Sequence, residues 1–171
     1  MISKLVYVYK RLFWSDEKYA RKIGVQIGNG CSIATRFFGS EPYLIEIGDY
    51  VQVTKEDSFF NHGGAWVFRK EFPKFDYFGK IKVGNNVYIG NRTLVMPGVT
   101  IGDNVIIGAG SVITKSVSSN SVVAGVPARV IGGLVELQER LLPYNLNTKG
   151  LSYEDKKSKL LSLNDDLFIT K

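Results

Sequence analysis

His62 is the only histidine in this chain, and it stands in the stretch Asn61–Arg69, which reads NHGGAWVFR. Histidine suits the removal of a proton from a hydroxyl or an amine near neutral pH, because imidazole titrates close to that range. A lone histidine is more often a structural residue. The place of His62 directly before a long irregular segment favours a chemical role, so we take it as the candidate general base.

The irregular segment, residues 62–80, is rich in aromatic residues and contains three glycines and a proline, which argue against a regular helix. A segment of this length that interrupts regular structure usually has a function. We expect a protruding loop in which Trp66 could serve as a platform for a sugar ring. Ordinary packing of the loop aromatics is the alternative.

The elements that must position this loop follow from a repeat, because residues 83–118 consist of one six-residue unit written six times. The first place of each unit is always Val or Ile, which chance alone would produce roughly once in twenty thousand trials. These first-place residues are Val83, Ile89, Val95, Ile101, Ile107 and Ile113. Gly follows in four units, and the fifth place is always small or β-branched.

A period of six does not fit a helix and is three times the strand period of two. Each unit therefore reads as a very short strand that turns one β-branched side chain inward before a corner. Glycine or asparagine supplies the corner dihedrals that a Cβ would resist. Stacked coils bury together what one such strand cannot bury alone, so the repeat predicts an all-β solenoid.

The same pattern begins upstream with Ile27–Ser32, but its register then shifts. Ile47 follows Ile33 by 14 residues, which is not a multiple of six, so we expect a small insertion around residues 39–43. Cys31, the only cysteine, occupies the fifth place of its unit and is expected to pack rather than to act as a nucleophile.

At the N-terminus, residues 2–13 carry apolar side chains at helical spacing, and a second helical piece is expected at residues 15–22. We expect residues 1–22 to form a helical cap over the first coil, whose open strand edge would otherwise aggregate. Contact with a membrane surface is the alternative role, although one short amphipathic helix supports it weakly.

The predicted solenoid occupies residues 23–132 and includes the loop at residues 62–80. Residues 133–171 form the predicted C-terminal helical extension, with one helix at residues 133–142 and another at residues 152–163. We expect this extension to cover the other end of the solenoid or to reach a neighbouring subunit.

Composition sets few further limits. Apolar residues at 44% and charged residues at 22% are ordinary for a soluble globular protein, and no run approaches the ~18 apolar residues of a membrane-spanning helix. Basic residues interrupt the N-terminus, so it does not resemble a secretory signal, and a cytoplasmic location is expected. The net charge of +6 comes with no nucleic-acid motif, and a phosphate-rich cofactor would explain it equally well.

The hexads, followed by AGVPARVI at Ala124–Ile131, resemble the hexapeptide-repeat acyltransferases, whose fold is a left-handed parallel β-helix. The resemblance covers roughly residues 23–131. It implies an acyl-CoA donor, here acetyl-CoA, and a homotrimer with active sites between neighbouring subunits. The left-handed sense rests on the resemblance alone, because parallel β crossovers are normally right-handed.

The stretch around His62 is similar to the catalytic loop of the polysaccharide-type acetyltransferases in that superfamily. The resemblance implies that His62 deprotonates a sugar hydroxyl or amine, which attacks the thioester directly, without an acyl-enzyme. Relatives commonly have an acidic residue directly after the histidine, where this chain has Gly63. Asn61, Asp57, Glu56 or an acid of an adjoining subunit could orient the ring instead.

The resemblance also implies a set of residues that bind the cofactor. Ala109 would lie against the pantetheine arm, with Thr114 and Lys115 one edge further along it. Asn91, 18 residues or one coil before Ala109, would line the same groove. Arg129 would bind the adenosine phosphates, because a guanidinium contacts phosphate oxygens in pairs. Plain packing of Ala109 and a solvated Arg129 are the alternatives.

A sugar precursor of capsule, lipopolysaccharide or another surface polysaccharide is the acceptor that the resemblance implies. A xenobiotic (antibiotic) acetyltransferase and a non-catalytic scaffold or binding module remain open, as do oxygen and nitrogen acceptors. Solenoids of this kind also build zinc sites from three histidines of adjacent subunits. With one histidine in the chain, we expect no metal.

Overall fold

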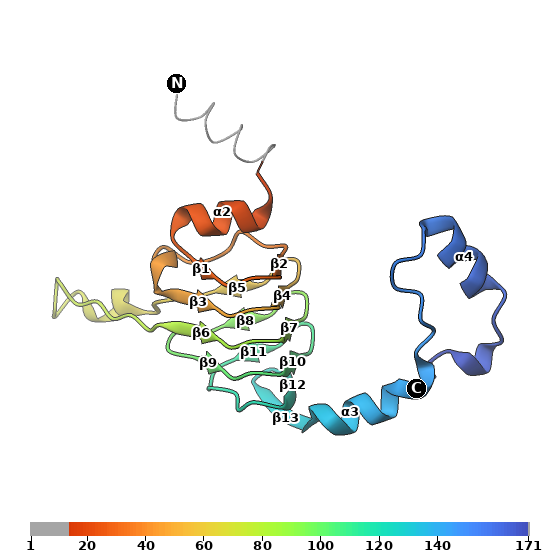
Figure 1. The fold of residues 1–171 in the computed structure, drawn as a ribbon. Coiled ribbons are helices and arrows are strands. Elements are labelled where there is room, and N and C mark those ends of the chain that lie inside the picture. The colour runs from red at the N-terminus through yellow and green to blue at the C-terminus, as the bar shows by residue number, and fades with distance from the viewer. Residues whose placement is uncertain (1–13, 171) are drawn as a thin grey trace. The chain divides into compact units, whose positions relative to one another are not determined.

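The computed structural model describes residues 14–170 of the chain, so the amphipathic pattern at residues 2–13 lies outside the described residues. The chain forms two compact units, Met1–Leu134 and Val135–Lys171. The first unit holds every strand in the described part of the chain (Figure 1).

The strands of the first unit form three sheets, here named A, B and C. Sheet A consists of β1 (Gln26–Ile27), β3 (Ile45–Ile47), β6 (Ile81–Val83) and β9 (Thr100–Ile101). Sheet B consists of β2 (Ser32–Ile33), β4 (Gln52–Val53), β7 (Val87–Ile89), β10 (Val105–Ile107), β12 (Ser121–Gly125) and β13 (Ala128–Gly133). Sheet C consists of β5 (Ser58–Phe59), β8 (Leu94–Val95) and β11 (Val112–Ile113).

The chain visits the three sheets in turn, so each complete coil between the two ends adds one strand to each sheet. All neighbouring strands are parallel except β12 and β13. Val83 pairs with Ile101, which gives coils of 18 residues, or three hexads. Ile33 pairs with Val53, two residues more than one coil, so the insertion near residues 39–43 is present. The short, mostly parallel strands agree with the all-β solenoid that the repeat predicted.

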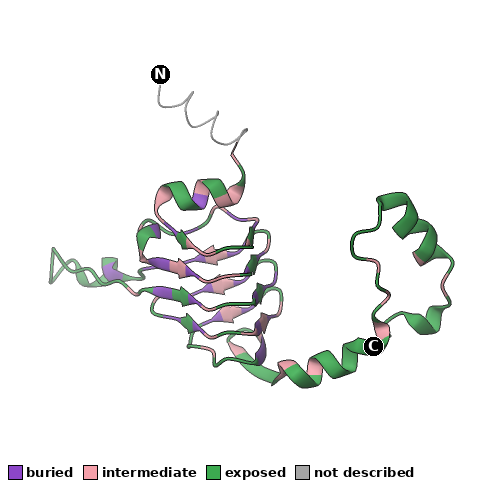
Figure 2. Cartoon of the chain, in the orientation of Figure 1, coloured by how far each residue is buried: buried purple, intermediate pink, exposed green. Residues whose placement is uncertain are grey.

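The first places of the hexads form the core of the coil. All six of these residues, from Val83 to Ile113, are at most 4% exposed. Burial of each Val or Ile side chain contributes roughly 1.5–3 kcal/mol, so stacking the coils stabilises strands of two or three residues that could not persist alone. Figure 2 shows this buried interior running through the stack of strands.

Asparagines at the corners between sheets A and B join successive coils. Asn86, Asn104 and Asn120 all have positive φ angles, which asparagine tolerates better than most residues. The Asn86 side-chain amide donates to Asn104 Oδ1 at 2.8 Å, and the Asn104 amide donates to Asn120 Oδ1 at 3.1 Å. This ladder satisfies side chains that the tight corners would otherwise leave unpaired.

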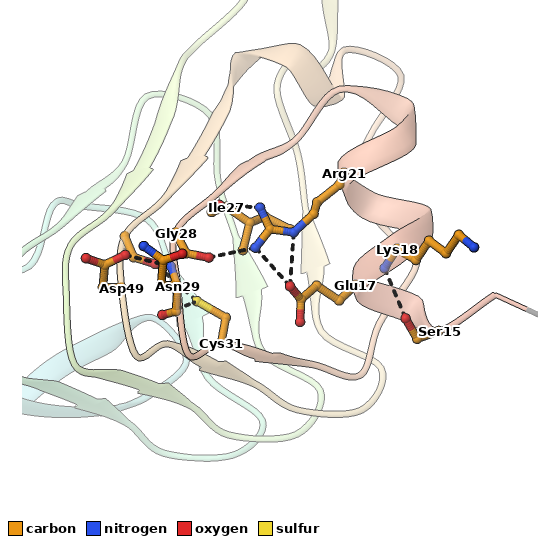
Figure 3. Close-up of polar contacts among 10 residues, drawn as sticks. Ser15, Glu17, Lys18, Arg21, Ile27, Gly28, Asn29, Cys31 and Asp49 are labelled. Carbon is orange, nitrogen blue, oxygen red and sulfur yellow. Dashed lines mark hydrogen bonds and ion pairs between the residues drawn. The ribbon is translucent and has the colours of Figure 1, made fainter.

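Helix α2 (Asp16–Ile23) lies on the first coil, where residues 15–22 were predicted to be helical. Its N-cap is Ser15, and Gly24, with a φ of 113°, ends it. Arg21 on α2 donates to the backbone carbonyls of Ile27 and Gly28 and pairs with Glu17 (Figure 3). Ile27 ends β1, the outermost strand of sheet A, and Gly28 follows it directly, so Arg21 satisfies part of an open edge.

Cys31 is partly buried and packs against the core, where its thiol donates to the Gly48 carbonyl at 3.2 Å (Figure 3). The sequence predicted this packing role.

The second unit contains helix α3 (Leu134–Leu141) except for its first residue, helix α4 (Tyr153–Leu161) and the short 3₁₀ turns η3 (Leu142–Tyr144) and η4 (Asp165–Leu167). Ser152 caps α4 by accepting a hydrogen bond from the Asp155 amide. In the described part of this unit no residue is buried. None of the helices described in the chain is long and apolar enough to cross a bilayer.

Candidate active site

His62 lies where the chain passes from sheet C to sheet A, after β5 and before β6. Residues 62–80, named the arm from here on, begin at this turn and project away from the coil (Figure 1). The two limbs of the arm meet again at its root, where His62 pairs with Phe78 in an antiparallel bridge. The Gly79 amide donates to the Asn61 carbonyl at 2.6 Å, so the turn that carries His62 is closed.

The imidazole of His62 faces the insertion that shifts the hexad register. Its Nε2 lies 2.9 Å from Ser40 Oγ and 3.7 Å from Glu41 Oε2. The Glu41 side chain is only 17% exposed, whereas that of His62 is 42% exposed. A carboxylate so close attracts a positive charge on the ring, more strongly where water is partly excluded. Sequence reasoning missed both residues because it treated the insertion only as a correction of register.

The acids named from the sequence are engaged at another edge of the coil. Glu56 and Asp57 lie in the turn from sheet B to sheet C. Glu56 pairs with Arg92 at 2.7 Å, and Asp57 accepts a hydrogen bond from the Thr93 amide at 2.9 Å. Glu41 is therefore the acid beside His62 in this chain.

Asn61 is fully buried, and within the described structure its side-chain nitrogen and oxygen have no hydrogen-bond partner. Successive residues of an extended segment point to opposite sides, so Asn61 turns inward where His62 turns outward. Its amide oxygen lies under Gly39, where an added Cβ would come within 2.5 Å of it. Asn61 thus contacts the base of the insertion that carries Ser40 and Glu41.

Asp57 is buried at the other edge, and desolvation raises the pKa of its carboxyl from 3.8 to about 6, against the lowering effect of hydrogen bonds from Thr93 and Thr54. Thr35 Oγ1 donates to its backbone carbonyl at 2.7 Å. The residue joins three turns of the coil and has a structural role.

A hollow of about 490 Å³ opens beside His62. Its other lining residues are Phe60, Gly63, Tyr77, Leu94, Met96 and Pro97. Most of this surface is apolar, with the imidazole and the Tyr77 hydroxyl as its polar groups. Such a surface suits the C–H face of a sugar or the thioester end of a long acyl carrier, with the base at one side.

A second hollow, of about 260 Å³, brings together three of the residues predicted to bind the cofactor: Thr114, Lys115 and Arg129. Thr114 and Lys115 follow β11 of sheet C, just as His62 follows β5, so they share one edge of the coil. Strand β8 lies between β5 and β11. At a spacing of about 4.8 Å per strand, the second hollow lies roughly 10 Å along this edge from His62.

Asn91 and Ala109 lie on a different edge, in the turns from sheet B to sheet C. They stack on neighbouring coils, as the 18-residue spacing predicted, because the Gly110 amide donates to the Asn91 carbonyl at 2.8 Å. The Asn91 side-chain oxygen accepts from the Lys55 amide at 3.0 Å. Within one chain, these two residues do not share an edge with His62.

Trp66 lies on the arm, in the 3₁₀ turn η2 (Ala65–Phe68), and is 79% exposed. It does not line the hollow beside His62. Among residues 14–170, no group of three or more His, Cys, Asp or Glu residues could hold a metal ion.

Comparison with known proteins identifies a family and a similar protein. Residues 80–115 match the bacterial transferase hexapeptide family (six repeats). Protein CapG of Staphylococcus aureus is 47% identical over 151 residues, which cover 86% of this chain and 88% of CapG. The chain belongs to the bacterial hexapeptide transferase family. This hexapeptide transferase is accordingly an acyltransferase, and the family resemblance seen in the hexads is confirmed.

Solved structures of the family resemble this hexapeptide transferase over most of its length. A maltose O-acetyltransferase from Clostridium difficile 630 is 27% identical with a TM-score of 0.60, covering 77% of this chain and 83% of its own. A galactoside acetyltransferase in complex with coenzyme A is 29% identical with a TM-score of 0.60, covering 80% of both chains.

Proposed function

We propose that the chain is an acetyl-CoA-dependent O-acetyltransferase that acts on a sugar, as a precursor of capsule, lipopolysaccharide or another surface polysaccharide. The observation that carries the proposal is the single edge of the coil, where His62 and its apolar hollow lie in line with the hollow of Thr114, Lys115 and Arg129. At one end of this edge His62 can act as a base, and at the other end Lys115 and Arg129 supply positive charge.

In the proposed reaction, the acceptor hydroxyl takes the place that the Ser40 hydroxyl now occupies at His62 Nε2. Nε2 accepts the hydroxyl proton while the oxygen attacks the thioester carbonyl, and the departing thiolate of CoA takes that proton. The Glu41 carboxylate, 3.7 Å from Nε2, stabilises the imidazolium formed between these events. The acetyl group passes directly to the acceptor, with backbone amides of the glycine-rich turns as the oxyanion donors.

The donor would lie along the edge between the two hollows. Its thioester would reach His62, its pantetheine arm would cover the roughly 10 Å between them, and its phosphates would meet Lys115 and Arg129. The coenzyme A complex of the galactoside acetyltransferase supports this choice of donor. Acetyl-CoA as donor also favours the cytoplasmic location expected from the sequence.

The proposal includes the left-handed coil and the homotrimer that the family resemblance implies. Asn91 and Ala109 lie on an edge that a single chain keeps apart from His62, so they could line the same groove only from a neighbouring copy. Trp66 would meet the acceptor from the arm, and Asn61 would hold the insertion that carries Glu41.

The test is a thiol-release assay with acetyl-CoA against monosaccharides, oligosaccharides, nucleotide sugars and hydroxyl-bearing antibiotics. We expect one sugar class to stimulate release, and the His62→Ala variant to lose turnover while it still binds CoA. Full turnover in that variant would refute the role of His62. Stimulation by an antibiotic alone would replace the sugar with a xenobiotic acceptor. A folded protein that binds no CoA would point to the scaffold.

A further inference from the structure

The hydroxyl of Ser40 occupies the position beside His62 that the proposed reaction gives to the acceptor. Ser40 Oγ lies 2.9 Å from His62 Nε2, a distance at which a hydroxyl can pass its proton to a general base. The hydroxyl has one proton and a second acceptor, Glu41 Oε2, at 3.1 Å. Because the shorter of the two contacts is with the imidazole, the Ser40 hydroxyl is in place to give its proton to the base.

A stacked pair of buried rings ties the insertion that carries Ser40 to the strand that precedes His62. Phe38, two residues before Ser40, is 1% exposed and stacks on Phe59 with ring centroids 5.3 Å apart. Phe59 ends strand β5, three residues before His62, and its amide donates to the Phe37 carbonyl at 2.9 Å. The two segments that bring Ser40 and His62 together are therefore joined in the core.

The turn that carries Ser40 is fixed on both sides. On one side Gly39 has a φ of 66°, which glycine adopts readily, and the buried Asn61 side chain lies against it. On the other side Pro42 is buried and begins the 3₁₀ turn η1 (Pro42–Leu44), where its ring restricts the backbone. The contact between Ser40 and His62 is thus built into the coil.

We propose that Ser40 is a site of self-acetylation, which accepts the acetyl group when acetyl-CoA is bound and no sugar is present. A serine hydroxyl and a sugar hydroxyl are both alcohols, and an adjacent base activates either of them. A thioester carbonyl that is aligned with an acceptor at Nε2 is aligned with Ser40 Oγ as well. The inference rests on the proposed function for its donor and its base.

The step needs only the donor and the two side chains. Ser40 Oγ forms a bond to the acyl carbon while His62 Nε2 takes the hydroxyl proton. The bond between the acyl carbon and sulfur breaks, and the departing CoA thiolate takes the proton from Nε2. The products are an acetyl ester on Ser40 and free CoA.

The ester does not lie on the path of transfer to the sugar. It places an acetyl group beside Nε2, which offers no proton to the base and takes the room of the acceptor hydroxyl. A chain that holds the donor without an acceptor therefore blocks its own base. A sugar that binds first occupies the same position and protects Ser40, so the order in which donor and sugar are added should change the rate of transfer.

The experiment incubates the full chain with acetyl-CoA that is labelled in its acetyl group, without sugar, and stops the reaction with acid. We expect one acetyl ester per chain, located on Ser40 by peptide mass spectrometry. Neutral hydroxylamine releases acetyl groups from esters and not from lysine amides, so this treatment separates the Ser40 ester from lysines that acetyl-CoA modifies directly.

Three variants identify the residues involved. Ser40→Ala should lose the hydroxylamine-sensitive label, and His62→Ala should form it about 100-fold more slowly or less, because the base is missing. Ser119→Ala is the matched control, since this exposed serine accepts the Asp103 amide at 2.9 Å, at the corner between sheets A and B. It should become labelled as the parent does.

The outcomes separate this inference from the proposed function. An unlabelled Ser40 in a chain that transfers acetyl to a sugar would overturn the inference alone. Hydroxylamine-sensitive label that persists in Ser40→Ala, or that forms equally fast in His62→Ala, would also overturn it. Label on Ser40 in a chain that no sugar stimulates would support self-acetylation and remove the sugar acceptor. A chain that binds no CoA and forms no ester would overturn both.

Discussion

Replacing Asp57 with asparagine should stabilise the protein, and should do so only above acidic pH. Asp57 is fully buried, and its carboxylate accepts the Thr93 amide. Thr54 Oγ1 donates to the Ile89 carbonyl at 2.7 Å, so its one proton is used there. Its oxygen lies 3.4 Å from Asp57 Oδ2 and can accept a proton from a neutral carboxyl, or equally from the amide of asparagine.

The magnitude follows from the pKa of Asp57. Desolvation raises the pKa to about 6 in the folded chain, from an ordinary 3.8. The folded state therefore binds this proton more tightly than the unfolded state, so the free energy of unfolding falls as pH rises between these values. The complete loss amounts to roughly 3 kcal/mol and remains at higher pH. Asparagine cannot ionise, so Asp57→Asn escapes the loss.

The assay is chemical unfolding followed by circular dichroism at several pH values from about 4 to 7.5 and at one fixed protein concentration. The difference in unfolding free energy between Asp57→Asn and the parent should grow by roughly 2.5 kcal/mol over this range, mostly below pH 6. Asp103→Asn, at an exposed corner where the carboxylate accepts the Asn85 amide, controls for loss of a corner carboxylate. A difference that is constant across pH would refute the reasoning that burial penalises the Asp57 charge.

Three further changes test the site and the core. Glu41→Gln should lower kcat about tenfold, because the imidazolium of His62 loses its stabilising carboxylate. Ser40→Ala should change kcat by about threefold or less. Equal effects of the two variants on kcat in steady-state kinetics would contradict the role of Glu41. Arg129→Ala should raise the KM for acetyl-CoA about tenfold with kcat nearly unchanged, and an unaltered KM would count against phosphate binding. Ile107→Ala should lower the free energy of unfolding by about 2–5 kcal/mol, whereas Ile106→Ala, at a more exposed residue, should lower it by less than about 1.5 kcal/mol. Comparable losses in chemical denaturation would show that the inward-facing position contributes no more stability than its neighbour.

The coil could be predicted from the sequence because its structure is local and repeated. Each first-place Val or Ile meets the same environment six times, and Ile107, for example, is fully buried as its place requires. Glycine and asparagine stand at the corners because those positions need close approach or a positive φ. An added Cβ at Gly84 would lie 2.4 Å from Asp103 Oδ1.

The surroundings of His62 could be predicted only in part. Its place at the root of the arm followed from where the hexads stop. The approach of Ser40 and Glu41 depends on how two extra residues are accommodated one coil away, and no periodicity encodes that. The burial of Asn61 could have been predicted, because successive side chains of a strand point to opposite faces and its neighbour His62 points outward. That signal was available in the sequence.

The pairing of Val83 with Ile101 fixes the spacing between equivalent positions on successive coils. Adding or removing 18 residues would move Arg129 relative to His62 by one strand spacing, about 4.8 Å, and would leave every inward side chain facing inward. A shorter insertion, such as the two extra residues near 39–43, is accommodated between strands and leaves Ile33 paired with Val53. The distance between His62 and Arg129 can therefore change only by whole strand spacings. A donor of different length would require a solenoid with a different number of coils.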